Sequence, residues 1–118
     1  MKNKLKSLLY LQSKVKFAYL FGSYANQTYT DKSDVDIAVY LSDISLDTRL
    51  EVAHALEVSL QKNVDLVVLN DVKNMVLLEA ILKEGIVVKD ADERIYFEVE
   101  RHHAILDFKH FKRYIDAA

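Results

Sequence analysis

The stretch FGSYANQTYTDKSDVD, residues 21–36, contains the features that decide which fold and chemistry this sequence predicts. The chain has only two glycines in 118 residues, and Gly22 stands here beside Ser23, directly after the hydrophobic run VKFAYLF. Asp34 and Asp36 then stand one residue apart, where the next hydrophobic run, VDIAVYLS, begins. Runs rich in β-branched and aromatic residues predict strands. The stretch is therefore expected to connect two strands of one sheet.

The rest of the chain alternates helical and strand patterns, without proline or internal repeats. We expect helices at 3–13, about 45–62, 74–85 and 91–117, and strands at 15–21, 35–42, 64–70 and 86–90. This order predicts an α/β or α+β fold, in which a small mixed sheet is flanked by helices and followed by a long C-terminal helix.

Three details of the helices follow from local rules. Ser45 or Asp47 is expected to cap the second helix, and Gly85 is expected to end the third in the left-handed conformation. The apolar stripe of the second helix is expected to contain Leu50, Ala53, Leu56, Val58 and Leu60.

Length and composition indicate one soluble domain over residues 1–118, long enough to bury well over half of its unfolded surface. Apolar residues make up 51% and charged residues 29%, which argues against a disordered or membrane protein. No apolar run or cleavage site indicates a membrane span or a leader, so a cytoplasmic location is expected. The absence of cysteine excludes disulfides and thiolate metal sites. A net charge of -2 argues against binding nucleic acid by charge alone.

The segment at 91–117 has an unusually wide apolar band. Its apolar residues form two adjacent stripes, Ala104, Phe108, Phe111 and Ile115 on one and Ile95, Val99 and Leu106 on the other. A helix of this kind either lies across the core or presents a face to another chain. The sequence leaves both interpretations open.

The aspartates of the opening stretch have the spacing of a metal site. Residues i and i+2 of a strand point to the same side, so Asp34 and Asp36 can converge on one ligand. The apolar residues Val35, Ile37, Val39 and Leu41 are expected to face the opposite side. Two carboxylates so placed repel each other, and Mg²⁺ between them would remove that repulsion. The alternative is a pair of ordinary turn and strand-end acids. A calcium-binding EF-hand is excluded, because Asp36 and Ser42 occupy positions that need Gly and Glu.

Two further features can join that pair. Gly22 would let a ligand approach the backbone, and Ser23 can cap a short helix from about Tyr24 whose free N–H groups point at an anion. The acid of the apolar run VDLVVL, Asp65, would meet Asp34 and Asp36 at one sheet edge if the two strands are parallel neighbours. The alternatives are an ordinary strand-to-helix turn and an acid at a loop-to-strand boundary.

Together these residues resemble the signature of the nucleotidyltransferase superfamily that includes DNA polymerase beta and kanamycin nucleotidyltransferase. Gly22-Ser23 and Asp34-Val35-Asp36 are separated by ten residues, and a later acid follows in an apolar strand. The small size is similar to the minimal nucleotidyltransferase antitoxins. The resemblance implies that Asp34, Asp36 and Asp65 bind two Mg²⁺ ions and are catalytic.

In the family's reaction a hydroxyl attacks the α-phosphorus of a nucleoside triphosphate and releases pyrophosphate. The resemblance implies that the triphosphate is ATP. The resemblance implies that Gly22 and Ser23 hold the β- and γ-phosphates. Asp65 would also help to deprotonate the hydroxyl. The catalytic core would occupy about residues 15–90.

The resemblance also implies a partner. Minimal nucleotidyltransferases are typically paired with a HEPN-domain toxin, and the antitoxin would transfer AMP to a tyrosine of that toxin. The apolar helix at 91–117 would then be the docking face, in a homo- or hetero-oligomer. His102, His103 and His110 on this helix are expected to be interface or surface residues. The alternatives are a nucleotidyltransferase for small molecules such as antibiotics, and a non-catalytic antitoxin that neutralises its partner by binding.

The sequence departs from the family at Asn26 and Gln27, where close relatives have arginine and glycine. The arginine of those relatives could reach a phosphate. In this chain, another basic residue would have to supply that positive charge. Lys32 and the five lysines of the first sixteen residues are candidates. The alternative for the N-terminal lysines is a solvated helix face.

Overall fold

A four-stranded mixed sheet forms the centre of the computed structural model, which describes residues 1–117. The strands, in the order β3-β2-β1-β4, are β1 (Val15–Phe21), β2 (Val35–Leu41), β3 (Val64–Val68) and β4 (Ile86–Lys89). β1 is antiparallel to both β2 and β4, whereas β2 and β3 are parallel. The predicted mixed sheet is confirmed.

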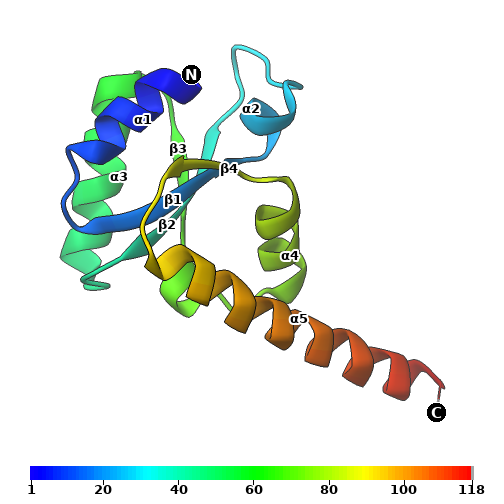
Figure 1. Cartoon of the computed structure of the whole chain (residues 1–118). Helices are drawn as coiled ribbons and strands as arrows, with labels where there is room; N and C mark the ends of the chain where they lie inside the picture. The colour runs from blue at the N-terminus through cyan, green and yellow to red at the C-terminus, as the bar shows by residue number, and fades with distance from the viewer. Residues whose placement is uncertain (118) are drawn as a thin grey trace.

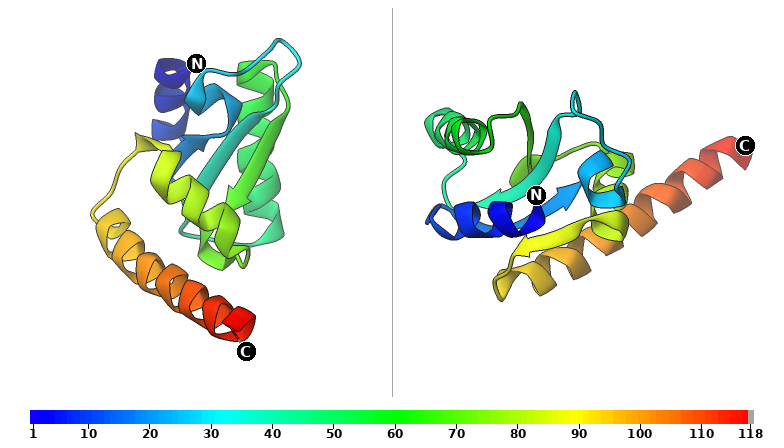
Figure 2. Two further views of the ribbon diagram at one scale, coloured as in Figure 1. Left: turned by 90° about the vertical axis from the view of Figure 1, so that its right-hand side faces the viewer. Right: turned by 90° about the horizontal axis from the view of Figure 1, so that it is seen from above.

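Helices cover both faces of this sheet (Figure 1, Figure 2). On one face lie α1 (Lys2–Tyr10) and α3 (Leu46–Leu60), and on the other α4 (Met75–Glu84) and α5 (Glu93–Ala117). The one-turn helix α2 (Ser23–Asn26) follows β1. The face of β2 that packs on α1 and α3 consists of Val35, Ile37, Val39 and Leu41, as predicted.

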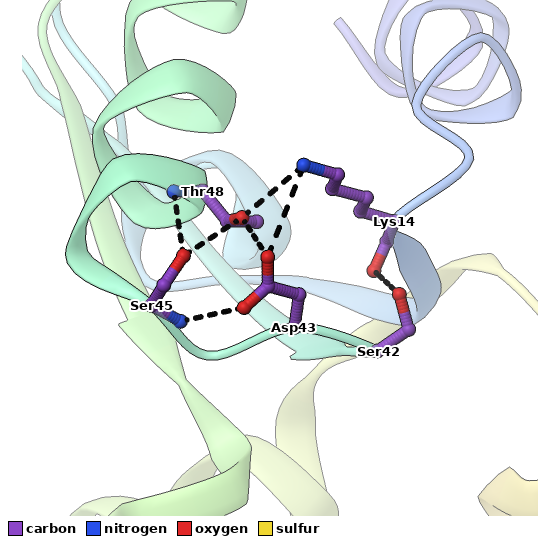
Figure 3. A network of polar contacts seen from close by, with 5 residues as sticks. All are labelled: Lys14, Ser42, Asp43, Ser45 and Thr48. Carbon is purple, nitrogen blue, oxygen red and sulfur yellow. Dashed lines mark hydrogen bonds and ion pairs between the residues drawn. The ribbon is translucent and has the colours of Figure 1, made fainter.

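The N-terminus of α3 is held to the end of β2 by a polar network (Figure 3). The Ser45 side chain accepts a hydrogen bond from the Thr48 backbone, which confirms Ser45 as the predicted cap. The Asp43 carboxylate accepts from the Ser45 backbone at 3.0 Å and from the Thr48 hydroxyl at 2.7 Å. These bonds hold the pKa of Asp43 below its usual range. The Lys14 ammonium lies 3.9 Å from the same carboxylate.

The predicted stripe of α3 is only partly right. The residues that face the sheet are Thr48, Val52, Leu56 and Leu60, spaced four apart. Leu50 and Val58 are 59% and 61% exposed, because they lie on the side of the helix that points away from the sheet. The prediction was wrong for these two residues because this helix has apolar residues on both sides.

The predicted left-handed cap at Gly85 is also wrong. Gly85 has φ -68° and ψ 148°, an extended conformation that leads directly into β4. Glycine is required for a different reason: a Cβ here would collide with the Ile81 carbonyl oxygen and lie 3.3 Å from the Tyr19 Cβ. The close approach of the last turn of α4, with Tyr19 of β1 also nearby, therefore explains this glycine, and a left-handed turn does not.

Several predicted elements, including α1 and β3, end earlier in the structure. α1 ends at Tyr10 and not at 13, and the Lys89 ammonium donates to the carbonyls of Leu9 and Gln12 at 2.9 Å each. β3 ends at Val68 and continues as the 3-10 turn η1 (Leu69–Asp71).

The helix α5 is partly packed and partly exposed. Phe97 and Ile105 are buried in the core. The Tyr19 hydroxyl donates a 2.6 Å hydrogen bond to Glu98, whose carboxylate also accepts from Arg94 at 2.9 Å. The stripe residues Ile95, Val99, Leu106, Phe108, Phe111 and Ile115 are all exposed. Beyond the sheet the helix projects as a free arm (Figure 1). The interpretation that this helix packs across the core is therefore correct for Phe97 and Ile105, and its docking on another chain stays a prediction.

None of the helices in the described part of the chain combines the length and the apolar character required to cross a membrane.

Candidate active site

Two of the predicted carboxylates lie side by side at the start of neighbouring strands. In the parallel pair formed by β2 and β3, Asp36 is the direct partner of Asp65. Ala38 and Val67, two residues further along each strand, both pack in the core against α4 and α5. Because side chains alternate along a strand, Asp36 and Asp65 project to this same face. The parallel arrangement on which the prediction depended is confirmed.

Asp34 joins the pair electrostatically. Burial of Asp36 raises its pKa, and the negative charges of Asp65 and Asp34 raise it further. A hydrogen bond between the carboxyl groups of Asp36 and Asp65 acts in the same direction, since only the protonated form can donate it. Asp36 is half-buried, whereas Asp34 and Asp65 are exposed. The structure thus pairs Asp36 with Asp65 and places Asp34 near enough for its charge to act on Asp36.

Gly22 lies directly against this cluster. Its φ of 70° and ψ of -151° fall in a region that only glycine adopts readily. A Cβ at this position would collide with the Asp36 carboxylate. The preceding residue, Phe21, pairs with Asp36 across β1 and β2. The glycine turn and the acid cluster therefore form one site at one edge of the sheet.

Ser23 begins α2 and does not cap it, in contrast to the prediction. The cap residue is Gly22, whose carbonyl accepts hydrogen bonds from the backbone of Ala25 at 3.1 Å and of Asn26 at 3.2 Å. The helix starts one residue earlier than expected because the positive φ of Gly22 turns the chain immediately after β1. The Ser23 hydroxyl is not engaged as a helix cap.

The two positions where the sequence departs from the family lie at the end of α2. The Asn26 side chain accepts hydrogen bonds from the Thr28 backbone at 3.2 Å and from the Thr28 hydroxyl at 2.6 Å. Gln27 has φ 63°, in the left-handed region that favours glycine. Asn26 is thus turned into its own loop, while Gln27 keeps the backbone conformation that a glycine would adopt.

Several lysines lie near α2, including one that the sequence did not indicate. Lys2 and Tyr24 line one cavity, and Lys32 lines a groove of about 640 Å³ that Asp34 borders. Lys62, which also lines that groove, lies 5.8 Å from the centroid of the Tyr24 ring. Lys62 was missed because this contact joins distant parts of the chain, although its place three residues before Asp65 was a usable signal.

The carboxylates around Asp36 fit only part of what a metal ion requires. Within residues 1–117 no group of three or more His, Cys, Asp or Glu side chains is arranged so that it could hold a metal ion by itself. Mg²⁺, however, is usually bound by one or two carboxylates together with substrate phosphates and water, and rarely by an all-protein cage. The repulsion around Asp36 would be relieved by a cation. The donor set therefore fits Mg²⁺ that arrives with a polyphosphate.

The histidines of α5 take no part in this site. His102, His103 and His110 are exposed, as expected of surface or interface residues. His102 borders a cavity between α4 and α5, together with Glu79 and Lys109.

Comparison with known proteins gives consistent matches. The family model described as "Polymerase beta, Nucleotidyltransferase" matches residues 3–94. The protein adenylyltransferase MntA of Shewanella oneidensis strain MR-1 is 40% identical over 74 residues, which are 61% of this chain. The match covers 52% of that protein, so the chain spans about half the length of this relative.

Two solved structures resemble nearly the whole chain. A chain in the crystal structure of a toxin–antitoxin with AMP-PNP has a TM-score of 0.81 and 29% identity, and 98% of this chain and 95% of that chain are covered. A chain in the crystal structure of the toxin–antitoxin MntA-HepT has a TM-score of 0.73 and 27% identity, with coverage of 98% and 93%. The long C-terminal helix is therefore included in the similarity.

Proposed function

The chain belongs to the polymerase beta nucleotidyltransferase family, and we propose that it transfers AMP from ATP to a hydroxyl group of a partner protein in a Mg²⁺-dependent reaction. The observation that carries the proposal is the contact of Gly22 with Asp36, which is the register partner of Asp65. A turn suited to phosphates thus adjoins carboxylates suited to a metal. The relative MntA is named a protein adenylyltransferase, which supports a protein acceptor.

Each residue of the site has a distinct role in this proposal. The backbone at Gly22 and the Ser23 hydroxyl bind the β- and γ-phosphates, while Asp34, Asp36 and Asp65 hold two Mg²⁺ ions. The metal supplies positive charge that stabilises the entering and leaving oxygens. The acceptor oxygen forms a bond to the α-phosphorus as the bond to the bridging oxygen breaks and pyrophosphate leaves. Asp65, the more exposed member of the register pair, accepts the proton of the attacking hydroxyl.

The proposed partner is a HEPN-domain toxin, and the proposed acceptor is one of its tyrosines. Similarity to chains from toxin–antitoxin structures supports a role as the antitoxin. The exposed end of α5 supports a docking role, because it carries five large apolar or aromatic residues that lie beyond the sheet: Leu106, Phe108, Phe111, Tyr114 and Ile115. A projecting helix with such a face would gain free energy by burying it against another chain.

A test of docking is the substitution Phe111→Asn, with Lys112→Asn as the matched control. Phe111 is 63% exposed and Lys112 is its exposed neighbour, so neither change should unfold the domain. We expect a co-expressed HEPN-domain partner to co-purify with Lys112→Asn but to bind Phe111→Asn at least tenfold more weakly, since about 1.4 kcal/mol of lost burial suffices. Equal binding by both variants would contradict docking through α5.

A non-catalytic antitoxin remains the second candidate function. The observation that favours it is Asn26, whose side chain is bound within its own loop where an arginine is expected. This candidate predicts that Asp36→Asn neutralises a co-expressed toxin as well as the wild-type chain does. The catalytic proposal predicts that this variant forms the complex but fails to neutralise the toxin.

A further inference from the structure

Two tyrosines and a lysine form a contact beneath α2. The Tyr24 ring is 8% exposed and stacks on the Tyr29 ring, with the ring centroids 4.4 Å apart and an interplanar angle of 8°. Lys62 lies 5.8 Å from the centroid of the Tyr24 ring. The Tyr24 side chain also raises the pKa of Lys62. We call these three residues the tyrosine–lysine clamp.

The tyrosine–lysine clamp joins the two halves of the candidate site. Tyr24 directly follows Ser23 in α2, whereas Lys62 lies in the turn between α3 and β3, three residues before Asp65. Tyr29 belongs to the loop that leads from α2 back to the acids of β2. This contact therefore links the phosphate side of the site to the turn that precedes Asp65.

The ring that Lys62 contacts lies on the other side of the sheet from Asp36 and Asp65, while Lys62 also lines the groove that Asp34 borders. The Tyr24 ring packs in the core against α1 and α3, whereas Asp36 and Asp65 project to the face covered by α4 and α5. Lys62 therefore contacts Tyr24, the residue that follows Ser23 in the phosphate-binding turn.

We propose that Lys62 is a positioning residue, which acts through Tyr24 and Tyr29 to hold α2 and its phosphate-binding turn at a fixed place relative to Asp65. The catalytic consequence rests on the proposed nucleotidyl transfer. In-line transfer requires the leaving pyrophosphate and the attacking hydroxyl to lie on opposite sides of the α-phosphorus, and small displacements of either are costly. Loosening the clamp lowers the rate of transfer more than the affinity for ATP.

The mechanical part is tested without activity, by amide hydrogen exchange of the full chain. In Lys62→Met, the amides of residues 23–28 exchange about three- to fivefold faster, as the loss of one exposed cation–aromatic contact predicts. The matched control, Lys32→Met, removes an exposed lysine of the same groove and leaves these rates unchanged. Adding Tyr24→Phe to Lys62→Met does not accelerate the exchange of residues 23–28 any further. Unchanged exchange in Lys62→Met, or equal acceleration in the control, overturns the proposal.

The catalytic part is tested by steady-state kinetics of AMP transfer. Lys62→Met lowers kcat about tenfold and changes the KM for ATP less than twofold, and Lys62→Arg restores most of the rate. A raised KM with unchanged kcat would assign Lys62 to phosphate binding and overturn a positioning role. Absence of transfer by the wild-type chain would instead refute the proposed function, while the exchange experiment still decides whether the clamp holds α2.

Discussion

Replacement of Asp36 by Asn should make the metal-free chain more stable while abolishing transfer. Asp36 and Asp65 are register partners on adjacent strands, whose backbones are about 4.8 Å apart. Two unit charges about 5 Å apart repel by about 3 kcal/mol at an effective dielectric constant of about 20, and by about 0.8 kcal/mol in bulk water. Because Asp65 is exposed and Asp36 is only half-buried, the repulsion energy should lie near the lower of these two values. We expect a gain of about 1 kcal/mol.

The assay is urea and thermal unfolding of the chain without divalent cations at neutral pH. A gain of about 1 kcal/mol corresponds to about 4 °C in Tm for a domain of this length. The control is Asp31→Asn, which removes an exposed carboxylate of the preceding loop that is not among the charges raising the pKa of Asp36. The difference between the variants should shrink at high salt, because exposed charges are screened. If Asp36→Asn is no more stable than the wild-type chain, the predicted repulsion between Asp36 and Asp65 is refuted.

The same repulsion has a signature in pH. The folded-state pKa of Asp36 is raised above its ordinary value of about 4, so the native chain binds more protons than the unfolded chain between these two values. The contribution of Asp36 to stability therefore decreases as pH rises through this window and is constant above it. The Asp36→Asn variant should lack this decrease, which is measured by unfolding in urea at a series of pH values.

Three further changes test other parts of the account. Gly22→Ala should destabilise the chain by about 1–3 kcal/mol and weaken ATP binding, because of the positive φ and the collision with Asp36; ordinary stability and ATP binding in this variant would contradict that. Gln61 ends α3 in the left-handed conformation, with φ 55°, which glycine adopts without strain. Gln61→Gly should therefore stabilise the chain by up to about 1 kcal/mol in urea unfolding, and a loss of stability would show that Gln61 is not strained. Tyr19→Phe should cost about 1 kcal/mol by deleting the hydrogen bond to Glu98. Because burial raises the pKa of Tyr19, wild-type stability should fall above about pH 10, where the unfolded tyrosine ionises first, and this variant should show a smaller fall.

The fold and the acid cluster were predictable because they depend on short-range rules. Alternation along the second strand predicted that Val35 and Ile37 face one side and Asp36 the other, and the packing of Val35, Ile37 and Ala38 confirms this for the residues of β2. Asp34 precedes the strand. The position of Asp65 at the start of an apolar run was sufficient once β2 and β3 were assumed to be parallel. These inferences required only strand periodicity and one pairing.

The errors concern features that depend on tertiary contacts. Leu50 is apolar but faces away from the sheet, and only the packing of α3 shows that Val52 takes the buried position instead. Gly85 is extended, and a Cβ there is excluded by the Ile81 carbonyl oxygen and crowded by Tyr19, because the chain passes directly from α4 into β4; no local pattern reveals this. Lys62 contacts Tyr24 across 38 positions of sequence for the same reason.

The central claim is that Gly22, Ser23 and the three aspartates form a nucleotidyltransferase site. Its most direct test is transfer of label from α-labelled ATP to a co-expressed HEPN-domain partner, with and without Mg²⁺, by the wild-type chain and by Asp36→Asn. We predict label on the partner only with the wild-type chain and Mg²⁺. Because Asp36→Asn should be at least as stable as the wild-type chain, its inactivity could not be attributed to unfolding. Transfer that survives in Asp36→Asn, or that needs no divalent cation, would contradict the claim.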